Sequence, residues 1–338
     1  MSSKILLLAG AAVALVLAGC NKKPEAPVTP PAEATAPAAQ GIAVGEPNPS
    51  TPLAGQNINT GTPVDGPATV TSPATVGAGA IIEVGWTGPG NSGDYIDLVP
   101  RGSTATSGEI TYNYTRDAIP VAKLRAPTAP GDYDVRYVVQ LEGARAIKAT
   151  APVTVTAASA TLTAPSKAEA GEPFTVEWVG PAGNGDYVDL VPAGFTQVSG
   201  EITYAWTRDG NPAKLVAPGK AGAYQVRYVL EGAGKRTVLA SSALEVSAPA
   251  ATLKAPDSAA KGAKVKVEWT GPKRRGDYVD LVKKGQTAAS GELSYFYTDR
   301  DSSSELTAPA DAGDYEIRYV LEAPGGRQVL AKRSLTVR

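Results

Sequence analysis

The chain has 338 residues and a formal net charge of −1, so the length suggests two or three domains and the charge predicts no binding to nucleic acid. Histidine is absent and cysteine occurs once, which removes the commonest general base and zinc ligand and any disulfide within the chain. Catalysis would have to use carboxylates, lysine or tyrosine. We expect no cofactor, no metal ion and no catalytic residues.

The first residues have the pattern of a secretory signal. Lys4 precedes an apolar run over residues 5–17, shorter than the roughly 20 residues of a typical membrane-spanning helix. The run ends in Leu-Ala-Gly-Cys at residues 17–20, which resembles the bacterial lipobox. The resemblance implies a signal peptide over residues 1–19, cleavage before Cys20, and lipid attachment there, with acyl chains such as palmitate. A plain secretory signal with an incidental cysteine is the alternative.

The residue after the cysteine indicates the membrane to which the chain is sorted. Asn21 stands there instead of aspartate, which by enteric sorting rules implies the outer membrane, facing the periplasm or the cell surface. Residues 20–66 are rich in Pro, Ala, Thr and Gly and contain no aromatic residue. Such a stretch cannot bury enough apolar surface to offset its ordering entropy. We therefore expect a disordered, lipidated linker that holds the remainder of the chain away from the membrane.

One motif then occurs three times. Gly-Asp-Tyr-Ile/Val-Asp-Leu-Val begins at residues 93, 185 and 276, so consecutive copies are 92 and 91 residues apart. Equal spacing indicates tandem copies of one folding unit, with boundaries near 67–157, 158–249 and 250–338. Each unit has about the size of an immunoglobulin-type domain.

Period-two alternation predicts short strands in every copy. In the first copy these strands lie near residues 82–86, 95–98, 112–114, 123–124, 133–138 and 153–155, and the later copies add an opening strand at 160–162 or 251–253. No segment between them has a helical period. The pattern predicts an all-β fold of three tandem immunoglobulin-like β-sandwiches, with about seven strands each, after a signal helix and the linker. Trp86, Trp178 and Trp269 are the largest expected core side chains.

Three resemblances support this fold. Asp-Ala-Gly-Asp-Tyr at residues 311–315 resembles the turn of the immunoglobulin tyrosine corner, which implies that Tyr133, Tyr224 and Tyr315 bond back to the backbone. The Asp-Tyr-Val-Asp-Leu-Val and Gly-x-Tyr-x-Val-Arg-Tyr-Val strands resemble the SKICH domain, a sandwich used for targeting and protein contacts. The repeats also resemble those of bacterial envelope proteins that carry a von Willebrand factor A domain. None of these resemblances transfers a ligand.

The repeated carboxylates have a structural and a functional interpretation. Asp94 follows a glycine in a turn, where it can cap backbone amides, whereas a calcium site or a hydrolytic pair would need Asp94 and Asp97 to converge. The second aspartate of each motif alternates outward on a strand expected beside the strand that carries an outward arginine. We predict a solvent-facing ion pair in each copy, worth roughly 0.2–1 kcal/mol: Asp97 with Arg136, Asp189 with Arg227, and Asp280 with Arg318.

Surface features differ more between copies. The tyrosines are either half-buried strand residues or a carbohydrate-binding surface, and Phe195, Trp206 and Phe296 are the better candidates for a copy-specific surface because they do not recur. The third copy carries net charge +3, against −1 and −2 for the others. Its basic residues form a candidate patch for anionic cell-wall or lipid groups, opposed by a plain solvated loop: Lys273, Arg274, Arg275, Lys283 and Lys284.

Three functions remain open. The first is a membrane-anchored envelope lipoprotein that binds or spaces a partner without catalysis, the partner being another envelope protein or a cell-wall polymer. The second is a module that binds glycan or peptidoglycan. The third is a hydrolase that uses carboxylates alone.

Overall fold

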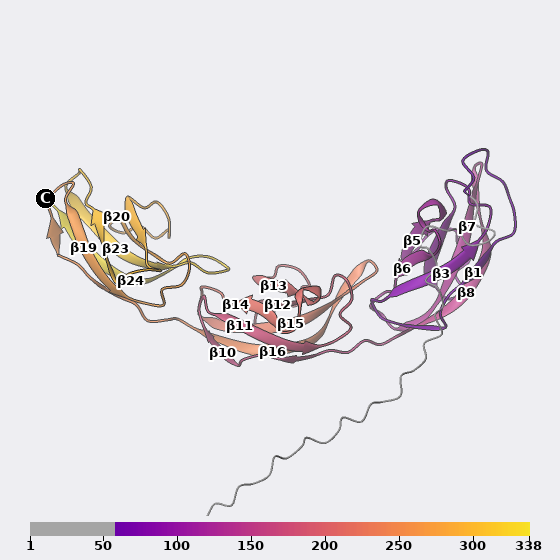
Figure 1. The fold of residues 1–338 in the computed structure, drawn as a ribbon, viewed down its shortest axis with the longest axis horizontal. Coiled ribbons are helices and arrows are strands. Elements are labelled where there is room, and N and C mark those ends of the chain that lie inside the picture. The colour runs from indigo at the N-terminus through magenta and orange to yellow at the C-terminus, as the bar shows by residue number, and fades with distance from the viewer. Residues whose placement is uncertain (1–57) are drawn as a thin grey trace, which may run out of the picture. The chain divides into compact units, whose positions relative to one another are not determined.

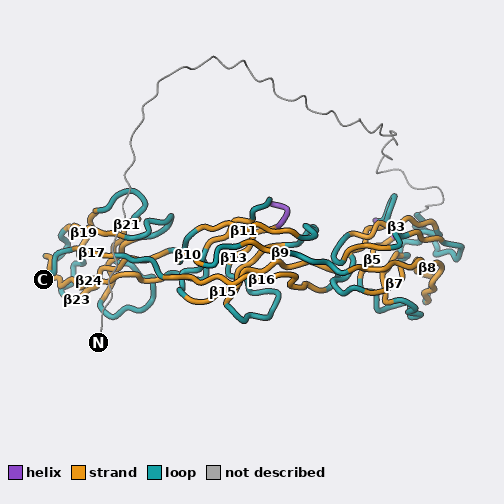
Figure 2. The backbone as a smooth tube through the Cα atoms, turned by 90° about the horizontal axis from the view of Figure 1, so that it is seen from below, coloured by secondary structure: helices purple, strands orange, loops and turns teal. Residues whose placement is uncertain are grey.

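The computed structural model describes residues 58–338, which are strands and loops with two short 3-10 turns (Figure 2). The predicted signal peptide, Cys20 and the linker up to residue 57 lie outside these residues. Within the described part, no helix has the length and apolarity needed to cross a bilayer.

The strands fall into three successive groups of eight. The first repeat contains β1 (Thr69–Thr71), β2 (Thr75–Gly77), β3 (Ile81–Thr87), β4 (Tyr95–Pro100), β5 (Thr111–Tyr114), the 3-10 turn η1 (Thr115–Asp117), β6 (Ala122–Arg125), β7 (Gly131–Leu141) and β8 (Ala144–Thr156). The second contains β9 (Thr161–Thr163), β10 (Lys167–Glu169), β11 (Pro173–Val179), β12 (Tyr187–Pro192), β13 (Thr203–Trp206), η2 (Thr207–Asp209), β14 (Ala213–Val216), β15 (Gly222–Gly232) and β16 (Lys235–Ser247). The third contains β17 (Thr252–Lys254), β18 (Ser258–Ala259), β19 (Lys264–Thr270), β20 (Tyr278–Lys283), β21 (Ser294–Tyr297), β22 (Ser303–Thr307), β23 (Gly313–Leu321) and β24 (Gln328–Val337).

Every repeat has the same topology. In the first, β1, β3 and β6 form a three-stranded sheet, and β2, β8, β7, β4 and β5 form a five-stranded sheet in that order. The two sheets of a repeat lie face to face (Figure 1). This confirms the predicted fold of three tandem β-sandwiches. The additional, eighth strand is β2, β10 or β18, which pairs parallel with the last strand of its repeat and is too short to show alternation.

The cores follow the predicted alternation. Ile82, Val84 and Trp86 of β3 are at most 1% exposed and face Ile96 and Leu98 of the opposite sheet. Each fully buried aliphatic side chain contributes roughly 1.5–3 kcal/mol, so these two strands carry much of the repeat's stability. The equivalent positions of the other repeats are filled in the same way.

The strand of the repeated motif departs from the prediction. One face of β4 was expected to be open to solvent, yet all residues from Tyr95 to Val99 are buried. The loop after β4 covers the outer face, where the Tyr95 hydroxyl donates to the Thr106 carbonyl at 2.8 Å. Central strands covered on both faces lose the alternation of exposed residues. The loop itself has no sequence period that would have revealed this cover.

The predicted tyrosine corners are confirmed in all repeats. The hydroxyls donate to the carbonyl four residues upstream, at 3.0 Å for Tyr133, 2.7 Å for Tyr224 and 3.0 Å for Tyr315. A second tyrosine explains the glycine after the core tryptophan strand. A Cβ at Gly180 would lie 2.7 Å from the ring of Tyr228, so only glycine fits this approach without a shift.

The last residues of the predicted linker contact the first repeat. Val64 donates its amide to the Asn91 side chain at 3.0 Å, and the Asn91 amide group donates to the Val64 carbonyl at 2.9 Å. Lys148 forms an ion pair with Asp65. The expectation that residues 58–66 lack ordered contacts is therefore wrong, because Asn91 supplies both a donor and an acceptor for the incoming backbone.

Candidate functional site

The first aspartate of the repeated motif organises a loop. One oxygen of Asp94 accepts from the Gln140 amide at 2.7 Å, and the other accepts from the Asn91 amide at 2.9 Å and the Tyr137 hydroxyl at 2.6 Å. Burial raises the pKa of Tyr137, and its hydrogen bond to Asp94 raises it further. Asp94 is fully buried, and its contacts are the capping role that the turn sequence suggested.

The second aspartate meets the predicted arginine in every repeat. Arg136 donates Nε and Nη2 to the two oxygens of Asp97 at 3.0 and 2.6 Å, and Nη1 to the carbonyls of Ser103 and Ala105 at 3.1 and 2.7 Å. The geometry recurs in the other repeats with Nη2–Oδ2 distances of 2.6 Å. The recurring pairs are Asp189 with Arg227 and Asp280 with Arg318.

The predicted location of these pairs is wrong. They were expected to face solvent, but Asp97 is 0% and Arg136 1% exposed, because the loop after β4 closes over them. Burial raises the pKa of the Asp97 carboxyl, and the guanidinium opposes that rise; bonding to the carboxylate raises the pKa of Arg136. Removing one partner of such a buried pair lowers the free energy of unfolding by roughly 3–5 kcal/mol. This is well above the roughly 0.2–1 kcal/mol predicted for a solvent-facing pair.

The carboxylates of the motif therefore serve the fold. Asp94 and Asp97 do not converge on one site, and every oxygen of both accepts an internal hydrogen bond. Among residues 58–338, no group of three or more acids, cysteines or histidines is arranged to hold a metal ion.

The five basic residues of the third repeat do not form one patch. Lys273, Arg274 and Arg275 precede β20, whereas Lys283 ends it and Lys284 follows, so β20 separates the two groups. A six-residue strand spans roughly 17–20 Å. The Arg274 guanidinium pairs with Glu169 at 3.2 Å, and Lys284 pairs with Asp314 at 3.6 Å.

A different surface emerges at the outer edge of each five-stranded sheet. In the third repeat, Tyr278 of β20 lies beside Tyr295 and Tyr297 of the edge strand β21. The ring centroids are 6.1 Å apart for Tyr278 and Tyr295 and 5.6 Å for Tyr295 and Tyr297, with edge-to-face angles of 72° and 81°. We call this three-ring cluster the aromatic edge.

The aromatic edge recurs in the other repeats. Its members are Tyr95, Tyr112 and Tyr114 in the first repeat, and Tyr187, Tyr204 and Trp206 in the second. The first ring of each cluster is buried, whereas the middle ring is 48–55% exposed. An arginine lies over the first ring in every copy, at 5.4–5.5 Å from the centroid. These arginines are Arg145, Arg236 and Arg327.

The aromatic edge of the third repeat borders a pocket of about 280 Å³. Tyr278 donates its hydroxyl to Glu292 at 2.9 Å, and Arg327 pairs with Glu322 at 2.6 Å. A backbone hydrogen bond, with the Tyr278 hydroxyl adding to it, holds the pKa of Glu292 below its usual value. The wall is therefore aromatic, with an ionised carboxylate and a guanidinium at its rim.

The structure revises which aromatic residues reach the surface. Phe296 points inward and packs on Trp269 with centroids 4.8 Å apart, and Phe195 is half-buried beneath Arg227. Of the three residues expected to form a copy-specific surface, Trp206 lies in an aromatic edge. The exposed rings are mainly the recurring tyrosines. The alternation of Tyr295 and Tyr297 about inward Phe296 was the sequence signal for this edge.

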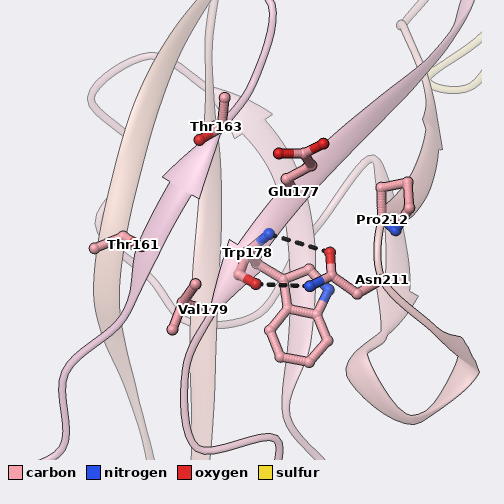
Figure 3. Close-up of a pocket in the computed structure, with 7 residues that line it drawn as sticks. All are labelled: Thr161, Thr163, Glu177, Trp178, Val179, Asn211 and Pro212. Carbon is pink, nitrogen blue, oxygen red and sulfur yellow. Dashed lines mark hydrogen bonds between the residues drawn. The ribbon is translucent and has the colours of Figure 1, made fainter. Parts of the chain in front are cut away.

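A second recurring hollow lies on the three-stranded sheet. In the second repeat it has a volume of about 310 Å³ and lies where β11 passes from pairing with β14 to pairing with β9. Asn211 completes the exposed strand there: its amide group donates to the Trp178 carbonyl at 2.8 Å, and its oxygen accepts from the Trp178 amide at 3.3 Å (Figure 3). The Asn211 side chain thus takes the place of a neighbouring strand.

Comparisons with known proteins define no family. No family model matches the chain, and no curated protein matches it. Among solved structures, the FN1–FN3 domains of chicken CNTN1 are similar at 13% identity and a TM-score of 0.22, over 82% of this chain and 100% of that one. The strand pairing within each repeat defines the sandwich fold independently of this similarity.

Proposed function

We propose that the chain is a lipid-anchored cell-envelope protein whose tandem sandwiches bind or space a partner without catalysis. One observation carries the proposal: the buried charged groups shared by all repeats are occupied by internal bonds, as Asp97 is by Arg136. Surface side chains are then left to act on other molecules.

The anchor is the part of this proposal that rests on sequence. The lipobox-like residues 17–20 support lipid on Cys20, and Asn21 supports the outer membrane. The SKICH and von Willebrand resemblances remain resemblances of sequence. In bacteria fed an alkyne-labelled palmitate, we expect label on the wild-type chain and its recovery with membranes. Cys20→Ala should give an unlabelled chain. Label on that variant would contradict the anchor.

Binding and spacing can be separated by changing the number of repeats. Crosslinking in the native envelope would identify the partner of the full chain. If the chain is a spacer, removing residues 158–249 should shift which partner residues are crosslinked without abolishing capture. If a particular repeat binds, its removal should abolish capture. Turnover of a captured polymer by the purified chain would contradict the non-catalytic proposal.

A further inference from the structure

We propose that the aromatic edges bind a polysaccharide chain built of pyranose sugars. This inference rests on the proposed binding function and gives it a ligand class. A pyranose ring has an apolar C–H face and a rim of hydroxyls, so a matching site needs exposed rings beside a few polar groups. Ligand sites generally combine a mostly apolar wall with a small number of such groups.

Neighbouring side chains fix the orientation of the exposed rings. Tyr295 and Tyr297 are 55% and 57% exposed, although tyrosine usually buries much of its ring in a sheet. Edge-to-face packing of Tyr295 on Tyr278, and of Tyr297 on Tyr295, fixes their orientation. Tyr278 is itself held by hydrogen bonds to Ala289 and Glu292. Neither exposed hydroxyl bonds to any described residue. Rigid rings bind with a small loss of side-chain entropy, because few torsions remain to be ordered.

Polar groups for sugar hydroxyls surround the third aromatic edge. Glu292, Glu322 and Arg327 line the pocket. Arg327 donates a hydrogen bond to Glu322 at 2.6 Å and forms a longer ion pair with Glu292 at 3.8 Å. Carboxylates accept from hydroxyls, whereas the guanidinium donates to ring or hydroxyl oxygens. In the first two repeats the corresponding Glu109 and Glu201 each have one buried oxygen with no hydrogen-bond partner among the described residues, so only their other oxygen is a candidate contact for a sugar.

Repetition favours a polymer over a single small sugar. The same three-ring arrangement, with its overlying arginine, occurs once per repeat. Three weak sites on one chain can engage a repeating ligand together, and linked sites raise affinity by roughly 10²–10⁴-fold without new contacts. A polysaccharide presents equivalent units along its length, which suits equivalent sites.

The fluorescence of one tryptophan can report ligand binding to the second repeat. Trp206 belongs to its aromatic edge and is half-buried, with Arg208 over its ring at 4.8 Å. Trp86 lies in the core of its repeat, whereas Trp178 and Trp269 also line the hollows on the three-stranded sheets. A sugar stacked on Trp206 should change the indole emission, whereas binding at the aromatic edges of the other two repeats, which contain only tyrosines, should not.

The test uses the full-length chain in detergent micelles and four insoluble probes: cellulose, chitin, β-1,3-glucan and purified peptidoglycan. We expect co-sedimentation with at least one probe and a change in Trp206 emission with its soluble oligosaccharide. Replacing the exposed pair in the third repeat, Tyr295→Ala with Tyr297→Ala, should weaken binding about tenfold because one of three linked sites is lost. Val179→Ala is the control, since Val179 is 72% exposed but lies on the three-stranded sheet of the second repeat, away from every aromatic edge.

Three outcomes would overturn the inference: no probe binds, the tyrosine variant binds as the wild type does, or the control variant loses binding equally. A synthetic peptide of residues 24–37 tests the rival occupant, because aromatic surfaces also bind proline-rich segments. Binding of that peptide in place of the polysaccharides would likewise refute it. Membrane retention through Cys20 and partner crosslinks that survive the tyrosine substitutions would leave the proposed function standing while the sugar inference fails.

Discussion

Removing the guanidinium of the first repeat should destabilise that repeat strongly. Arg136→Ala eliminates two bonds to Asp97 and two to loop carbonyls, and it leaves the carboxylate 0% exposed without a counter-charge. Breaking a buried pair in this way costs roughly 3–5 kcal/mol. The exposed pair of Lys123 and Glu83, 3.8 Å apart in the same repeat, gives the control, and Lys123→Ala should cost less than about 1 kcal/mol.

Hydrogen exchange under denaturant measures the free energy of opening for each repeat separately, because peptides from β4 and β7 report on the first repeat within the full chain. A double substitution, Asp97→Leu with Arg136→Met, should cost less than Arg136→Ala alone, since no charge is left buried. If Arg136→Ala destabilises the repeat no more than Lys123→Ala does, the pair does not support the fold and the reasoning fails.

Three further predictions concern other recurring features. Gly180→Ala should cost about 1–3 kcal/mol, because its Cβ would press on the Tyr228 ring; unchanged denaturant midpoints would show that the loop relaxes freely. Tyr315→Phe removes the bond to the Asp311 carbonyl and should lower the unfolding free energy of the third repeat by about 1 kcal/mol, measured by calorimetry against the unsubstituted chain. Burial raises the pKa of Tyr319 to about 12, whereas an unfolded tyrosine titrates near 10, so the folded state holds its proton longer. The stability that the neutral Tyr319 contributes is therefore complete below pH 10 and is lost as the pH rises from 10 through 12. Absorbance at the tyrosinate band should show a late, cooperative titration step. A single non-cooperative step near pH 10 would contradict this.

The fold could be predicted because three copies of each strand carry the same alternation. Ile82, Val84 and Trp86 show which face is buried, and the equal spacing of Asp94, Asp186 and Asp277 shows the size of the unit. The tyrosine corner was also predictable, since its hydrogen bond is local, from one residue to the fourth before it. Alternation and local turns are encoded over a few residues.

The environment of the motif could not be predicted in the same way. The pairing of Asp97 with Arg136 follows from strand order, but their burial depends on a loop whose residues contribute carbonyls, which have no side-chain signature. The closeness of the basic residues in sequence predicts one patch, but β20 lies between the two groups and separates them. Exposure of Tyr295 depends on β21 being the sheet edge, which only the strand order shows.

The central claim is that the buried charges maintain the fold, whereas the exposed aromatic edges bind the ligand. Its most direct test compares two full-length variants in one co-sedimentation assay with cell-wall polysaccharide. One lacks the buried pair of the second repeat (Asp189→Leu with Arg227→Met), and the other lacks the aromatic edge of that repeat (Tyr204→Ala with Trp206→Ala). We expect the first to sediment as the wild type does and the second to bind more weakly. A first variant that is folded, by circular dichroism, yet loses the polysaccharide would show that the buried pair serves the ligand.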